Sequence, residues 1–143
     1  LEAAGDAMKD EEAVLVAPQV TLLQVGHHGS DTSSTAAFLD AVQPRYAVIS
    51  SGKRAEGANT GYCHPRRSVV DRLVARLGAS DGGRLVEAFD FDRAKDAGVS
   101  CSKDAPDVYW PKVLGSERLW LTLDEDVTLE TSGDGVFTQV QSQ

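Results

Sequence analysis

Three histidines are the side chains of this sequence best suited to chemistry, and they lie in two short segments. His27 and His28 are adjacent and flanked by glycines, in the segment GHHGS that ends at Ser30. His64 lies in the segment GYCHP, directly before a proline. A neutral imidazole binds zinc, and the same ring gives or takes a proton near neutral pH. The glycines let the first segment approach a ligand closely. Spacing alone leaves open whether that segment is functional or a surface loop with a helix cap.

Two further residues have alternative interpretations. Asp6 follows a glycine and precedes an expected helix, so it is either an N-cap or a carboxylate that bridges metal ions. Ser30 either caps the next helix or hydrogen-bonds a substrate oxygen. A serine nucleophile is disfavoured, because the G-x-S-x-G elbow that exposes such a serine is absent around Ser30.

The elements that must position these residues alternate between strand and helix. Apolar runs rich in β-formers predict strands over residues 20–25 and 46–50, and helical spacing predicts helices over 36–42 and 65–77. Such alternation indicates an α/β fold, in which the loops at the carboxyl ends of the strands build the site. Both histidine segments follow a predicted strand.

The second half of the chain is expected to be less regular. Residues 82–117 read as an insertion that is charged and irregular between 90 and 112. After it, alternating residues and a Gly-Asp-Gly turn predict a terminal antiparallel β meander. Its expected strands are residues 119–123, 127–130 and 136–140.

Composition limits the choice of partners and compartment. The net charge of −8 argues against non-specific attraction to nucleic acid, although bound metal ions would reverse the sign of a pocket. No apolar stretch approaches the ~20 residues of a membrane helix, so no membrane segment is expected. Cys63 and Cys101 are too few for a disulfide framework. We expect two free thiols in a reducing compartment, with Cys63 in a packing role.

The order of these motifs resembles the metallo-β-lactamase superfamily, and most closely the hydrolase domain of ComEC competence proteins. That group typically shows T-G-D, then L-K-V-G-H-H-G-S, then A-V-I-S and then Y-G-H-P-H. This chain has Gly5-Asp6, LLQVGHHGS over 22–30, YAVIS over 46–50 and YCHP over 62–65. The likeness covers residues 4 to about 78 and continues weakly near the C-terminal strands. It implies an αββα sandwich, of which this chain is the C-terminal half.

The resemblance also implies a role for each candidate residue. Asp6 would bridge two divalent metal ions, zinc or manganese, and His64 would bind one of them. His28, together with His27, would give a proton near the scissile phosphate, and Ser30 would contact the substrate. The parent activity would be metal-dependent hydrolysis of a phosphodiester, with nucleic acid as the implied substrate.

This chain also departs from the pattern of the family. The upstream metal motif H-x-H-x-D-H is absent, Cys63 replaces a glycine and Arg66 replaces the second histidine. A catalytic zinc usually has three protein ligands, so we expect the chain alone to bind little or no metal and to be inactive. We therefore predict one partial domain over residues 1–143, whose partner is its own N-terminal half. The alternative is a degenerate, non-catalytic module for packing or partner binding.

Overall fold

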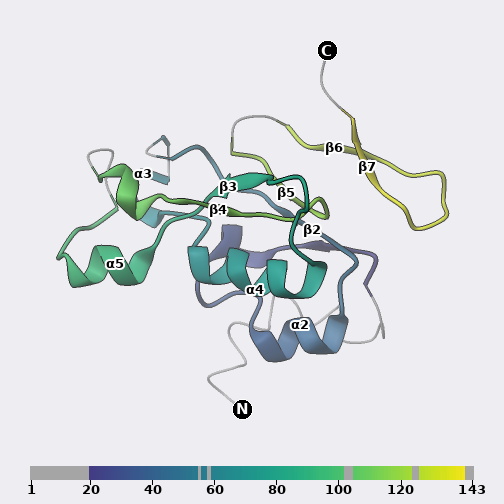
Figure 1. Ribbon diagram of the computed structural model, residues 1–143, viewed down its shortest axis with the longest axis horizontal. Helices are drawn as coiled ribbons and strands as arrows, with labels where there is room; N and C mark the ends of the chain where they lie inside the picture. Colours follow the sequence, from purple (N-terminus) through teal and green to yellow (C-terminus); the bar gives the residue numbers. More distant parts are fainter. Residues whose placement is uncertain (1–19, 55, 58, 102–104, 124–125, 141–143) are drawn as a thin grey trace.

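A three-stranded parallel sheet is the centre of the fold (Figure 1). The computed structural model describes residues 20–140, apart from 55, 58, 102–104 and 124–125. The strands lie in the order β1-β2-β5, with Leu22 opposite Tyr46 and Ala47 opposite Leu119. Their bounds are β1 Leu22–Gln24, β2 Tyr46–Ile49 and β5 Leu119–Leu121. The two strands expected before residue 51 are confirmed.

Two helices cover one face of this sheet. They are α2, Ala36–Val42, and α4, Arg67–Leu77, and Figure 1 shows both on the same side of the strands. The hydroxyl of Thr35 caps α2 by accepting a hydrogen bond from the backbone N–H of Phe38 at 3.2 Å. The main core lies between these layers. Its fully buried members include Leu39, Val42, Ala47, Ile49, Val69, Val70, Leu73 and Leu119.

The opposite face of the sheet is only partly covered. Tyr46 stacks on the buried ring of Trp120 with 5.4 Å between centroids, and Phe137 meets Tyr46 edge-on at 5.7 Å. Leu22 on the neighbouring strand is half-buried and Gln24 is exposed. A one-sided sheet of this kind is compatible with a second layer. The second layer of an αββα sandwich remains a prediction.

The described residues of the segment 82–117 contain regular secondary structure, so the expectation of an irregular stretch between 90 and 112 was wrong. Strands β3, Leu85–Glu87, and β4, Lys112–Leu114, pair antiparallel, and the helix α5, Phe91–Asp96, and the 3-10 turn η3, Asp107–Tyr109, lie between them. A small second core explains this order. It contains Cys63, Phe89, Ala94, Ala105 and Trp110, with 5.1 Å between the two aromatic ring centroids. These residues are too widely spaced to give a periodic pattern.

The terminal meander is confirmed only in part. Strands β6, Thr128–Glu130, and β7, Thr138–Val140, form an antiparallel pair. The first expected strand, β5, instead pairs in parallel with β2. Alternation in a sequence identifies a strand but not its neighbour, and here the burial of Leu119 and Trp120 draws β5 into the main sheet. Among the described residues, no helix has the length and apolar character needed to cross a membrane.

Candidate functional site

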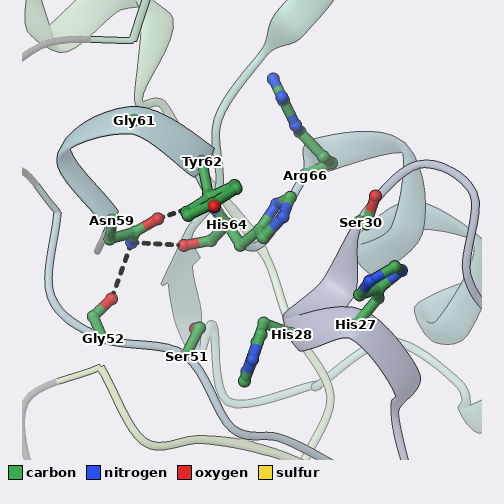
Figure 2. A pocket seen from close by; sticks show the side chains of 10 residues that line it. All are labelled: His27, His28, Ser30, Ser51, Gly52, Asn59, Gly61, Tyr62, His64 and Arg66. Atoms are coloured by element: carbon green, nitrogen blue, oxygen red, sulfur yellow. Dashed lines mark hydrogen bonds between the residues drawn. The ribbon is translucent and has the colours of Figure 1, made fainter.

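A pocket with a volume of about 640 Å³ lies where strands β1 and β2 end. Figure 2 shows the side chains around it, with His28 turned toward Ser51 and His27 next to Ser30. All three histidines line this pocket, as expected for loops at the carboxyl ends of parallel strands. The lining consists of His27, His28, Ser30, Ser51, Gly52, Asn59, Gly61, Tyr62, His64 and Arg66.

The first histidine segment is a tight turn with unusual backbone angles. It is the 3-10 turn η2, Gly26–Gly29, in which His27 and His28 have φ of 50° and 55°. Both side chains are exposed. The Nδ1 of His28 lies 2.5 Å from the carbonyl oxygen of Ser50. A carbonyl only accepts, so Nδ1 is the protonated donor and Nε2 remains for a ligand.

Gly29 brings the two histidine segments together. Its φ is +80°, and a Cβ at this position would lie only 2.8 Å from the Cβ of Pro65. Its carbonyl accepts a hydrogen bond of 2.9 Å from the backbone N–H of Arg66. Only glycine supplies both the positive φ and the close approach, so this residue type sets the spacing between the segments of His28 and His64.

Asn59 holds the second histidine segment in place. It is buried in the short helix α3, Asn59–Tyr62, within a stretch that the sequence predicts as a loop. Its Oδ1 accepts from the backbone N–H of His64 at 2.6 Å, and its Nδ2 donates to the carbonyl of His64 at 2.7 Å and that of Gly52 at 2.8 Å. One amide therefore fixes His64 against the loop that follows β2.

His64 is neutral at physiological pH. The pKa of its imidazole is lowered to about 4, first by burial and then by electrostatic repulsion from Arg66, His28 and His27, while Asp31 acts in the opposite direction. Its Nδ1 is buried and has no hydrogen-bond partner in the described part of the chain. A neutral ring with an unused nitrogen can accept a proton or bind a metal ion.

Arg66 adds a permanent positive charge to the pocket. Its guanidinium lies over the rings of Phe89 and Phe91, at 5.1 and 4.5 Å from their centroids, and 4.0 Å from a carboxylate oxygen of Asp31. Burial lowers the pKa of Arg66, but a guanidinium stays protonated in proteins. The buried Nε and Nη1 atoms of Arg66 have no hydrogen-bond partner among the described residues. Among the described residues that line the pocket none is acidic, so the pocket has the positive charge of Arg66, partly offset by Asp31, and suits an anion although the chain carries a charge of −8.

A disulfide bond joins Cys63 to Cys101, so the expectation of free thiols was wrong. The two Cα atoms are 5.6 Å apart although 38 positions separate them in sequence. The fold of residues 82–117 brings Cys101 to Cys63, which sequence spacing alone does not reveal. The bond ties the residue before His64 to the second core.

Helix α4 anchors the segment that follows the first two histidines. The guanidinium of Arg72 donates to the backbone carbonyls of Asp31, Ser33 and Ser34 at 3.1 to 3.2 Å. Ser30 does not cap α2. Its hydroxyl lies 3.3 Å from that of Thr32 rather than bonding a described histidine, which gives no support to a serine nucleophile.

The described residues alone do not fit a metal centre. They contain no group of three or more His, Cys, Asp or Glu side chains placed to hold a metal ion. Asp6, the expected bridging carboxylate, lies outside the described residues. His28 and His64 share one pocket, and their predicted roles remain predictions.

Sequence reasoning assigned no site role to six of the residues that line this pocket, among them Asn59, Tyr62 and Arg66. Asn59 lies in a polar stretch with no local signal. Tyr62 and Arg66 belong to the family-like segment, but their residue types alone did not indicate a place in the site. The available indication was that Tyr62 and Arg66 each lie two residues from the candidate His64.

Comparison with known proteins finds relatives over part of the chain. Competence protein ComA of Neisseria gonorrhoeae is 52% identical over 54 residues, which cover 38% of this chain and 7% of that protein. ComE operon protein 3 of Bacillus subtilis is 38% identical over 73 residues, which cover 48% of this chain and 9% of that protein. Recombination protein 2 of Haemophilus influenzae is 38% identical over 71 residues, which cover 48% of this chain and 8% of that protein.

These relatives are competence and recombination proteins, and the chain spans less than a tenth of the length of each. The resemblance to competence proteins is therefore supported over part of the chain. No family model and no solved structure matches the chain.

Proposed function

We propose that this chain is part of a domain that binds and hydrolyses a nucleic-acid phosphodiester in a competence-type protein. The observation that carries this proposal is the meeting of three histidines and Arg66 in one pocket whose described lining residues include no acidic side chain. A phosphodiester is an anion, and arginine is well suited to bind its oxygens. The similarity to proteins named for competence and recombination supports nucleic acid as the ligand.

His28 is the proposed proton donor. In the imidazolium form, Nδ1–H donates to the carbonyl of Ser50 and Nε2–H is available for the pocket. In hydrolysis, water attacks phosphorus and the bond to the leaving oxygen breaks. The leaving oxygen takes the proton from Nε2, and the proton released by the attacking water passes to solvent. A positioned donor of this kind typically contributes about 10²–10⁴-fold to the rate. His27 and Ser30, on the same wall, would contact the substrate.

Metal binding is proposed for the complete domain. Two divalent ions, zinc or manganese, would need ligands from outside the described residues, with Asp6 and His64 in the set. The partner would be the first half of the domain, packed on the sheet face that carries the half-buried Leu22 and the exposed Gln24.

The roles of the two histidines can be separated in a complete protein that contains this chain. We expect His28→Ala to reduce cleavage of a labelled oligonucleotide by about 10²-fold or more without changing the bound metal measured by elemental analysis. We expect His64→Ala to lower the metal content. His28→Gln serves as a control of similar size. Loss of metal in the His28 variants would refute the assignment.

A non-catalytic module is the second candidate, favoured by the absence of a three-residue metal group in the described part of the chain. In that case the pocket would bind a phosphodiester without cleaving it. A complete protein that binds oligonucleotide but retains no zinc or manganese would support this candidate over hydrolysis.

A further inference from the structure

The most exposed large hydrophobic side chain among the described residues lies at the pocket and is an aromatic ring. Tyr62 keeps 65% of its surface exposed, whereas Trp110 and Trp120 are each 3% exposed. One side of the Tyr62 ring faces the His64 ring, with 6.1 Å between centroids and 26° between planes (Figure 2). The exposed remainder is a flat apolar surface at the edge of a cationic pocket.

The backbone of Tyr62 is fixed before any ligand binds. The hydrogen bonds of Asn59 hold the helix on one side, and the disulfide bond of Cys63 holds the next residue. Binding costs roughly 0.5–1.5 kcal/mol for each immobilised side chain and a further amount for ordering a loop, and an anchored backbone avoids the second cost. Tyr62 is therefore better suited to a specific contact than an aromatic residue on a free loop.

We propose that Tyr62 stacks on a base of single-stranded nucleic acid whose phosphate lies beside Arg66 and His64. This inference rests on the proposed function. Every base has a flat π-face, so a tyrosine accepts any base, and a cationic groove supplies the complementary attraction for phosphate. In a duplex, base faces are covered by their neighbours, so a single strand is the form that exposes a face to Tyr62.

The test uses a complete protein that contains this chain and measures its binding to two fluorescently labelled ligands of equal length, an oligothymidylate and the same backbone with abasic sites. The variants are Tyr62→Ala and the matched Tyr62→Phe, which keeps the ring. We expect Tyr62→Ala to weaken oligothymidylate binding roughly 5- to 150-fold and to leave abasic binding unchanged. We expect Tyr62→Phe to stay within about twofold of the parent chain. Urea unfolding checks that both variants remain folded.

The outcomes separate this inference from the proposed function. If Tyr62→Ala weakens the binding of both ligands equally, or weakens the binding of neither, the role of Tyr62 in stacking is overturned. If the parent protein, complete and containing this chain, binds neither ligand, phosphodiester binding fails as well. If the abasic ligand binds and bases add no affinity, only the stacking inference fails.

Discussion

Replacing Gly29 by alanine should separate the two histidine segments. The added Cβ would lie 2.8 Å from the Cβ of Pro65 and 3.3 Å from Cγ2 of Ile49. Pro65 and Ile49 are fully buried, so neither can move into open space. The substitution also places a side chain at φ +80°.

The expected cost has two parts. A left-handed backbone costs an alanine about 1–2 kcal/mol. Overpacking a well-filled site costs about 1–3 kcal/mol more. We therefore expect Gly29→Ala to lower the free energy of unfolding by roughly 2–5 kcal/mol. Part of the loss would be the hydrogen bond between Gly29 and Arg66.

Urea unfolding followed by the fluorescence of the buried Trp110 and Trp120 measures this cost. Gly83→Ala is the matched control, because Gly83 has φ +70° and no neighbour within 4 Å of the added carbon. It should cost only the backbone part, about 1–2 kcal/mol. If the two variants are equally stable, the close approach of Gly29 to Pro65 does not have the energetic importance assigned to it.

Three other predictions concern the second histidine segment. The free energy of unfolding should fall by on the order of 1 kcal/mol, after allowance for solvent screening, as pH drops from about 6.5 to about 4. The reason is that folding holds the pKa of His64 near 4, so the unfolded chain binds the proton first. His64→Gln should remove this pH dependence in urea titrations. Dithiothreitol should destabilise the parent chain by roughly 3–4 kcal/mol, because opening the bond between Cys63 and Cys101 frees a long loop. It should leave the stability of the Cys101→Ser variant unchanged. An equal response of both proteins would contradict the disulfide bond. Asn59→Asp should cost about 2–4 kcal/mol, because a carboxylate cannot donate to the carbonyls of His64 and Gly52; an unchanged thermal midpoint would exclude the bridging role.

The sequence predicts local structure well where pattern and burial coincide. Residues 46–49 and 67–77 form the expected strand and helix, because their apolar side chains form the main core. The shared location of His28 and His64 follows from the rule on parallel strand ends.

What the sequence does not predict depends on contacts between distant segments. The partner of β5 follows from the burial of Leu119 in the main sheet, and the bond of Cys63 follows from the path of residues 82–117. The role of Asn59 follows from carbonyls of two segments, residues 52–53 and His64, that meet at one amide. No local sequence pattern predicts contacts between segments that lie far apart in the chain.

The anchoring of both histidine segments to α4 bears on how this chain would select its ligands. Arg72 holds the turn after His28, and Pro65, which touches Gly29, precedes the same helix. The spacing of the histidines is thus a constant of the scaffold. Differences in ligand preference would then come from exposed side chains carried on these fixed segments, such as Tyr62. A change of such a side chain would alter the ligand without altering the spacing of the histidine pair.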